Sequence, residues 1–245
     1  MTMPDIQEQP VSNPNIMIQK GLTAALPIML GYLPVAITYG VLAKQSGLSL
    51  VELTLMSAFV YAGASQFMGV NMLAVGAGSI EIIVATFILN VRHFVMSLSF
   101  MNRLREIKLK WKAPLTLGLT DETFAVASFH KKEAQMENGV LFYTVLFILS
   151  YISWVGGSFL GGVLGEIVPD PLSQSMGIAL YAMFIGLLIP TVKKEVKVGL
   201  IAVIAMLIHT LCSEVLQLSA GWSIVIGTIL GGFFGVFIFE EEEQS

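Results

Sequence analysis

The sequence of 245 residues is 55% hydrophobic and only 12% charged, and its mean hydropathy is +0.79. Soluble domains carry roughly 25% charged residues, so this composition excludes a soluble protein and predicts an all-α integral membrane protein. The net charge of -4 and the acidic run at 240–243 argue against a nucleic-acid partner. The single cysteine, Cys212, excludes an internal disulfide and any multi-cysteine metal site.

Polar ends flank one long apolar region. Residues 1–20 form a polar tail without the basic start of a signal peptide, 240–245 form an acidic tail, and 21–239 form a single membrane domain. An apolar run of about 20 residues can cross the hydrocarbon as a helix. Such runs lie at 21–43, 53–80, 82–101, 139–165, 172–192, 199–218 and 222–239. With 113–129 as a questionable further segment, we expect seven or eight transmembrane segments, including broken or re-entrant helices.

The first apolar run contains Gly31-Tyr-Leu-Pro34 near its middle. A proline removes one backbone donor and frees an earlier carbonyl, so a kink or break is expected at Pro34. Gly31 and Pro34 are therefore candidates for offering backbone groups to a ligand, and a simple packing kink is the alternative.

The second run contains Tyr61-Ala-Gly63-Ala-Ser65-Gln66. Small residues allow neighbouring helices to approach closely. A buried amide such as Gln66 needs hydrogen-bond partners, which a neighbouring helix or a polar substrate can supply. Tyr61, Gly63, Ser65 and Gln66 are candidate substrate-binding residues.

The third run is interrupted by Asn90-Val-Arg92-His93. Arg92 either extends towards the basic loop that follows or forms a salt bridge with Asp121 or Glu122, and we predict the salt bridge because it neutralises two costly charges. His93 is either a proton shuttle near neutral pH or a hydrogen-bonded structural residue.

Segment 113–129 contains Thr120, Asp121 and Glu122. Adjacent helical residues point about 100° apart, so the two carboxylates face different surroundings unless the backbone breaks. One carboxylate can then hold the fold while the other exchanges a proton, as proton-coupled transport requires. The alternative is that the pair lies in water at a re-entrant tip.

The basic residues bear on whether 113–129 crosses the membrane. If the segment enters and returns on one side, the basic residues at 103–112, 131–132 and 193–197 share one face. The positive-inside rule favours this arrangement, with the N-terminus outside.

A weak internal repeat favours a crossing instead. The Pro-x-x-x-Gly motif at 27–31 recurs at 114–118, and small-residue motifs also recur. This repeat predicts inverted units at 21–101 and 113–192, followed by a helical hairpin at 199–239. A segment broken near Thr120 and Asp121 would satisfy much of both patterns.

The remaining motifs exclude several function classes. No ATP-binding Gly-x-x-x-x-Gly-Lys-Ser/Thr loop is present, so transport would be secondary or assisted by another protein. The histidines at 93, 130 and 209 lack zinc-site spacing, so neither a metal nor a cofactor is expected. An intramembrane hydrolase lacks an assignable base for Ser65, and we expect no enzyme; a channel for small solutes remains an alternative.

Four motifs in order resemble the AzlC family, the large permease subunit of bacterial branched-chain amino acid exporters. They are Gly31-Tyr-Leu-Pro-Val-Ala36 with Gly40, Tyr61-Ala-Gly-Ala-Ser-Gln-Phe67, Val91-Arg-His93 and Gly118-Leu-Thr-Asp-Glu122 with Phe124-Ala125. Asn90 departs from the acidic residue expected in some relatives. The resemblance implies export of Leu, Ile, Val and Met across the bacterial cytoplasmic membrane, with a separate small AzlD-type membrane subunit.

The combined hypothesis is a proton-coupled exporter of hydrophobic amino acids that works by alternating access. The predicted substrate-binding residues are Gly31, Pro34, Tyr61, Gly63, Ser65, Gln66, Thr120 and Asp121. The predicted proton-coupling and charge network comprises Asp121, Glu122, Arg92, His93 and Asn90.

Overall fold

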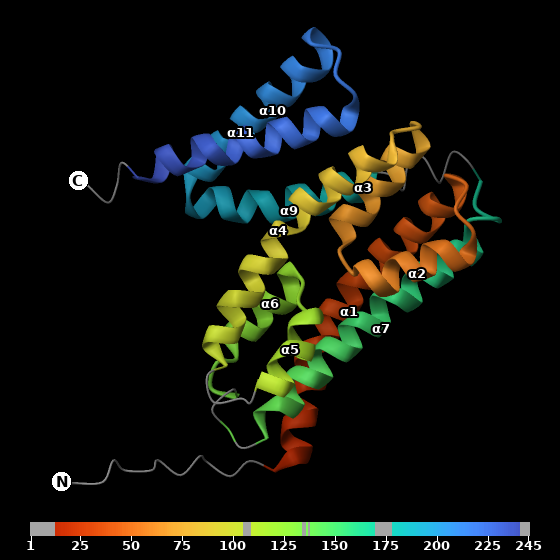
Figure 1. Ribbon diagram of the computed structural model, residues 1–245. Coiled ribbons are helices and arrows are strands. Elements are labelled where there is room, and N and C mark those ends of the chain that lie inside the picture. The colour runs from red at the N-terminus through yellow and green to blue at the C-terminus, as the bar shows by residue number, and fades with distance from the viewer. Residues whose placement is uncertain (1–12, 105–108, 134–135, 137, 170–177, 241–245) are drawn as a thin grey trace.

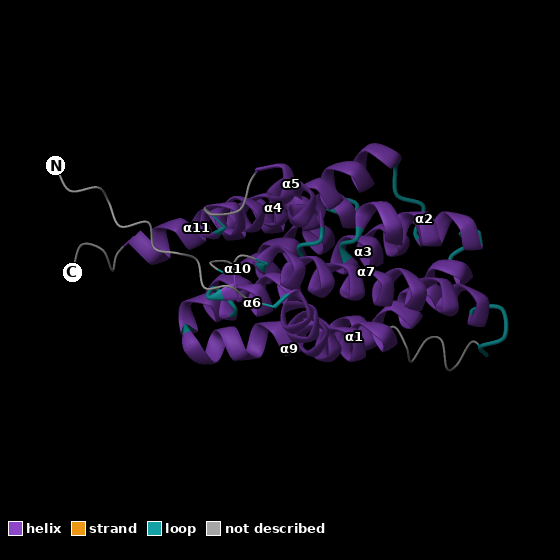
Figure 2. Ribbon diagram, turned by 90° about the horizontal axis from the view of Figure 1, so that it is seen from below, coloured by secondary structure: helices purple, strands orange, loops and turns teal. Residues whose placement is uncertain are grey.

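The computed structural model describes residues 13–104, 109–133, 136, 138–169 and 178–240, and every regular element within these ranges is a helix (Figure 1 and Figure 2). The helices are α1 Pro14–Gln45, α2 Leu50–Val60, α3 Gly63–Ala74, α4 Ser79–Arg103, α5 Leu109–Leu117, α6 Asp121–Phe129, α7 Gly139–Leu164, α9 Ile178–Lys194, α10 Val196–Thr210, the π-helix η2 Leu211–Val215 and α11 Ala220–Glu240. Five helical segments in the described ranges, formed by α1, α4, α7, α10 with η2, and α11, are long and apolar enough to cross a membrane. The predicted all-α membrane class is confirmed.

Helices α1 and α7 lie side by side over most of their length (Figure 1). A Cβ built on Gly21 would lie 2.8 Å from the carbonyl oxygen of Phe142, and one built on Gly40 would lie 2.1 Å from that of Ser158. At the far end, Lys44 pairs with Glu166 at 2.9 Å. Because the contacting residue numbers rise together, the two helices run parallel, and their glycines allow close backbone approach.

The single helix predicted at 53–80 is wrong, because the chain turns back at Tyr61 and Ala62. Tyr61 has a left-handed φ of 43°, which ends α2 and reverses the chain into α3. The Gln66 side-chain Nε2 of α3 then donates to the Ser57 Oγ of α2 at 2.8 Å. Hydropathy missed this turn because its residues are as apolar as those of a continuous helix. We call α2, α3 and the turn between them the first hairpin.

Segment 113–129 forms a second hairpin, made of α5, α6 and the turn at 118–120. The chain passes Phe147 of α7 at Gly118, and α6 then leads back to the start of α7, where the Tyr143 hydroxyl donates to the His130 carbonyl at 2.8 Å. The predicted break near Thr120 and Asp121 is therefore present, and the segment turns back on itself.

Helix α1 is continuous, so of the kink or break predicted at Pro34, the break is wrong. The helix continues through Pro27 and Pro34 for 32 residues. The Pro34 carbonyl accepts a hydrogen bond from Thr38 Oγ1 at 2.9 Å, and Pro34 is exposed. Side-chain bonds of this kind let membrane helices absorb a proline without breaking.

The two hairpins enter the bundle from opposite ends. The first follows α1 and begins near the end of α7, where Leu50 and Leu53 pack against Gly162. Helix α4 then returns towards the start of α7, where Phe100 meets Tyr143 with ring centroids 5.5 Å apart. The second hairpin begins at that end. The hairpin after α1 and the hairpin after α4 therefore enter the bundle from opposite ends.

One of these two ends carries the basic residues that follow α6. Lys20 near the start of α1 pairs with Glu133 at 3.1 Å, just after the basic residues Lys131 and Lys132. The start of α1 therefore lies beside the basic segment, and the N-terminus predicted on the opposite face is wrong because both apolar hairpins turn back instead of one. The positive-inside rule favours the cytoplasm for this end.

Helix α11 packs on α4 and on α10, and α10 in turn contacts α9 (Figure 1). Gly227, Gly231 and Gly235 of α11 pack closely on α10. Glu81 of α4 accepts hydrogen bonds from the Gly221 amide at 2.8 Å and from the Ser219 hydroxyl. A carboxylate at a helix N-terminus is stabilised by the helix dipole, so this contact anchors α11 on α4.

We predict that Gly40→Ala lowers the free energy of unfolding by about 1–3 kcal/mol, because its Cβ would meet the Ser158 carbonyl oxygen at 2.1 Å in a packed interface. Thermal melting of the purified protein in detergent measures the effect. Gly156→Ala on α7 is the matched control, since nothing lies within 4 Å of its Cβ. Equal melting temperatures for the two variants would contradict the close packing of α1 on α7.

Candidate functional site

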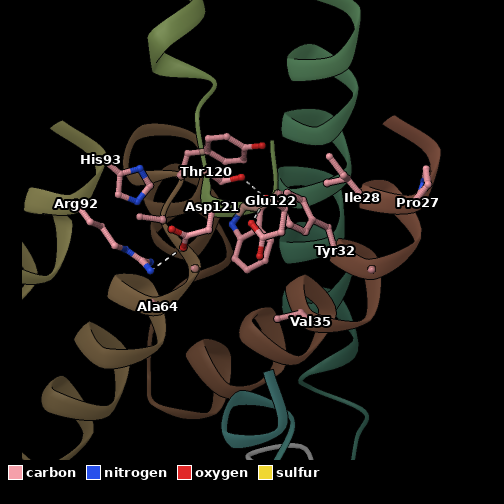
Figure 3. A pocket seen from close by; sticks show the side chains of 15 residues that line it. Pro27, Ile28, Tyr32, Val35, Ala64, Arg92, His93, Thr120, Asp121 and Glu122 are labelled. Atoms are coloured by element: carbon pink, nitrogen blue, oxygen red, sulfur yellow. Dashed lines mark hydrogen bonds and ion pairs between the residues drawn. The ribbon is translucent and has the colours of Figure 1, made fainter. Parts of the chain in front are cut away.

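A cavity of about 310 Å³ lies where the tips of the two hairpins meet, between α1, α4 and α7 (Figure 3). Its lining residues are Pro27, Ile28, Gly31, Tyr32, Val35, Tyr61, Ala62, Gly63, Ala64, Arg92, His93, Thr120, Asp121, Glu122 and Trp154. Four of these, Arg92, His93, Asp121 and Glu122, are ionisable residues of a kind that is rare and usually functional inside a membrane.

Arg92 and Asp121 form an ion pair at the cavity. The Arg92 Nη1 lies 2.6 Å from the Asp121 Oδ2 (Figure 3). This confirms the predicted salt bridge between the third apolar run and the carboxylate pair. The two side chains are 36% and 31% exposed, so the pair borders the cavity and is not fully enclosed.

The N-terminus of α6 positions both carboxylates. Thr120 and Thr123 form a capping box, in which the Thr120 amide donates to Thr123 Oγ1 at 2.7 Å and the Thr123 amide donates to Thr120 Oγ1 at 3.2 Å. Asp121 and Glu122 follow in the first turn, where the helix dipole stabilises negative charge. The capping residues therefore fix the start of α6, and Asp121 and Glu122 are its first two residues.

Glu122 has a different partner from Asp121. The Tyr32 hydroxyl donates to Glu122 Oε2 at 2.7 Å and lies 2.5 Å from Thr120 Oγ1. Asp121 therefore has a cationic partner, whereas the described partner of Glu122 is a neutral hydroxyl. Sequence reasoning missed Tyr32, although a tyrosine in the middle of an apolar helix needs a partner for its hydroxyl and was a usable signal.

His93 lines the cavity, and only one of its two ring nitrogens is hydrogen-bonded. Its Nδ1 lies 3.1 Å from the Leu119 carbonyl oxygen, and because a carbonyl only accepts, Nδ1 carries the proton. In the neutral ring Nε2 is then an acceptor. Among the described residues, His93 Nε2, Arg92 Nε and the Tyr61 hydroxyl are the buried side-chain atoms without a hydrogen-bond partner. All three belong to residues that line the cavity.

Four predicted site residues lie outside the cavity lining. Gln66 is bonded on both ends of its amide, to Ser57 and to the Trp154 indole at 2.9 Å. Ser65 donates to the Asn90 side-chain oxygen at 2.6 Å. These contacts hold the first hairpin against α7 and α4, so we correct the interpretation of Gln66 and Ser65 to a positioning role. Pro34 is exposed and lines neither this cavity nor its neighbour on the side of α5.

A second cavity of about 720 Å³ adjoins the first on the side of α5. The two cavities share Tyr61, Ala62 and His93. Apolar side chains such as Phe94 and Phe147 dominate the lining of the second cavity, and Asn90 also lies there. Sequence reasoning did not anticipate it, because it forms between a hairpin and helices that are distant in the sequence.

Comparison with known proteins decides the family. Residues 27–168, more than half of the chain, match the family model described as AzlC protein. The chain belongs to the AzlC family. No solved structure matches it.

Three relatives show how similar this chain is to other proteins. An uncharacterised membrane protein of Archaeoglobus fulgidus is 36% identical over 72% of this chain and 77% of its own length. The inner membrane protein YgaZ of Escherichia coli is 30% identical over 72% and 74%. The branched-chain amino acid transport protein AzlC of Bacillus subtilis is 28% identical over 70% and 66%. These relatives and the apolar helices identify a multi-pass membrane protein with a transport role.

We predict that Arg92→Gln and Asp121→Asn are coupled in their effect on stability. Each single change leaves one charge of the 2.6 Å pair uncompensated, whereas the double variant removes both. The double variant should lose about 0.5–3 kcal/mol less than the sum of the single losses, measured by thermal melting in detergent. Additive losses would show that the pair contributes nothing beyond its separate members.

Proposed function

We propose that this chain is the large subunit of a secondary transporter that exports branched-chain and other hydrophobic L-amino acids, such as Leu, Ile, Val and Met, across the cytoplasmic membrane. One observation carries the proposal: a cavity between opposed hairpin tips presents both hydrogen-bond donors and carboxylates inside a membrane bundle. The printed name of the Bacillus subtilis relative supports the substrate class.

The lining and volume of the cavity suit a zwitterion with an aliphatic side chain. Arg92 and the Tyr61 hydroxyl supply donors, while Glu122 and the His93 Nε2 supply acceptors. A volume of about 310 Å³ accommodates a small amino acid, and the adjoining apolar cavity extends the space available to its side chain. Alternating access then requires the hairpin tips to open the cavity to one side at a time.

Glu122 is the carboxylate that we assign to proton coupling. Asp121 is already neutralised by Arg92, so a proton or an ammonium group gains little there. The described partner of Glu122 is the Tyr32 hydroxyl, which leaves a negative charge that either a proton or the substrate ammonium can neutralise. Competition between the two for one carboxylate would couple amino acid export to proton entry.

A small AzlD-type membrane subunit is part of the proposal, because the family resemblance implies one. An enzymatic role is not proposed. The Ser65 hydroxyl donates to an amide oxygen of Asn90, and an amide oxygen is not a base that could activate a nucleophile.

We predict that Glu122→Gln abolishes proton-driven leucine uptake into inverted vesicles, in which export appears as uptake. Uptake should fall at least about tenfold, because a neutral amide can neither exchange a proton nor pair with the substrate ammonium as the carboxylate does. The vesicles should contain the small subunit. Glu166→Gln is the control, since that side chain is 67% exposed at the end of α7, away from the cavity.

Uptake by Glu122→Gln that keeps the wild-type dependence on the pH gradient would rule out Glu122 as the coupling group. Counterflow of labelled leucine separates a transporter from a channel. Saturable counterflow in proteoliposomes is expected, and flux that rises linearly with leucine concentration would favour the channel.

A further inference from the structure

We infer that the N-terminal end of α3, the Tyr61 hydroxyl and the Arg92 Nε form a binding site for the α-carboxylate of the substrate. This inference rests on the proposed function and deepens it, because it fixes which end of the amino acid lies against the first hairpin. The ammonium then lies at Glu122, which also lines the cavity.

The start of α3 has no side-chain cap. Its N-cap residue is Ala62, which cannot accept a hydrogen bond through its side chain. The first bond of the helix runs from the Gln66 amide to the Ala62 carbonyl at 2.9 Å, so the amides of Gly63, Ala64 and Ser65 precede it. The membrane-embedded starts of α6 and α3 differ in this respect, since α6 is capped by Thr120. Uncapped amides at a helix N-terminus attract anions.

Small residues bring this backbone to the edge of the cavity. Ala62, Gly63 and Ala64 all line it. A Cβ on Gly63 would lie 2.7 Å from the Trp154 Cη2, so the start of α3 rests directly on the Trp154 ring. A ligand on the cavity side can approach the amides without side chains in the way.

The Tyr61 hydroxyl is the independent observation that points to a ligand. Tyr61 is only 6% exposed, lines the cavity, and its hydroxyl has no hydrogen-bond partner. Its ring is held by an edge-to-face contact with Tyr151 at 5.0 Å, and its backbone has the uncommon φ of 43°. A buried hydroxyl fixed in this way and left unpaired costs free energy unless a ligand supplies the partner.

Arg92 supplies the third donor. Its Nη1 is bonded to Asp121, whereas its Nε is buried without a partner, and guanidinium nitrogens can only donate. Backbone amides, a hydroxyl and a guanidinium are together a donor set suited to a carboxylate. The carboxylate of Glu122 is suited to an ammonium because it is a negatively charged hydrogen-bond acceptor.

The test is competition against labelled L-leucine bound to the full chain in lipid nanodiscs containing the small subunit. One competitor, 3-methylbutylamine, keeps the ammonium and the side chain of leucine but lacks the carboxylate. The other, 4-methylpentanoate, keeps the carboxylate and lacks the ammonium. Tyr61→Phe should weaken leucine and 4-methylpentanoate about tenfold, because one hydrogen bond to a charged group is lost, and should leave 3-methylbutylamine within about twofold.

Two further variants make the result specific. Arg92→Lys keeps a positive charge for Asp121 but removes Nε, and it should show the same selective loss. Tyr39→Phe is the matched control, because its buried hydroxyl donates to the Leu53 carbonyl at 3.3 Å and lies outside the cavity lining. It should leave all three compounds unchanged.

Equal weakening of leucine and 3-methylbutylamine by Tyr61→Phe would overturn the carboxylate site, because the hydroxyl would then act on the cavity as a whole. Unchanged leucine binding in both Tyr61→Phe and Arg92→Lys would overturn it as well. In either case the wild type still binds leucine and the proposed function stands. Wild-type protein that binds none of the three compounds would overturn the proposed function and the site together.

Discussion

The structure depends on neutralising the ionisable groups that lie among apolar membrane helices. The Arg92 to Asp121 pair at 2.6 Å does this for two of them and joins α4 to the tip of the second hairpin. The pair forms only because the second hairpin breaks at 118–120, which brings the first turn of α6 to the level of Arg92. The backbone break, the helix cap at Thr120 and the ion pair therefore depend on one another, and the cavity lies around them.

The two carboxylates differ because of their partners and not their type. They are adjacent at the start of α6, yet one meets a guanidinium and the other a tyrosine hydroxyl from α1. A charge that is already paired contributes to the fold, whereas a charge with a weaker partner remains available for exchange. The donors of Arg92 differ in the same way, since its Nη1 pairs with Asp121 whereas its Nε is buried without a hydrogen-bond partner.

Hairpins of opposite direction explain how one cavity could be reached from two sides. The first hairpin begins at the end of the bundle that holds Lys44 and Glu166, and the second begins at the end that holds Lys20 and Glu133. Their tips meet at the cavity, and Tyr61 and His93 separate it from the second cavity. Movement of either tip would change access from one end while the other tip keeps its place.

Part of the fold and of the site could be predicted from the composition and from the cost of placing charged residues in a membrane. The all-α membrane class, the break near Thr120 and the Arg92 to Asp121 pair follow from hydropathy and from the need to neutralise charge. The first hairpin did not, because hydropathy reports the length of an apolar run and not whether the chain turns within it. The break expected at Pro34 failed since α1 continues through its proline, and Gln66 found its partners in Ser57 and Trp154 instead of a ligand.

The central claim, that the two hairpins enter from opposite faces, is tested most directly by cysteine accessibility. Cys212 is the only native cysteine, so Cys212→Ser gives a clean background. Single cysteines at Ser49 and Ala77 flank the first hairpin, and those at Lys110 and Lys131 flank the second. An impermeant maleimide should label the first two from one face of the membrane and the last two from the other. Labelling of Ser49→Cys and Ala77→Cys from opposite faces would contradict the account.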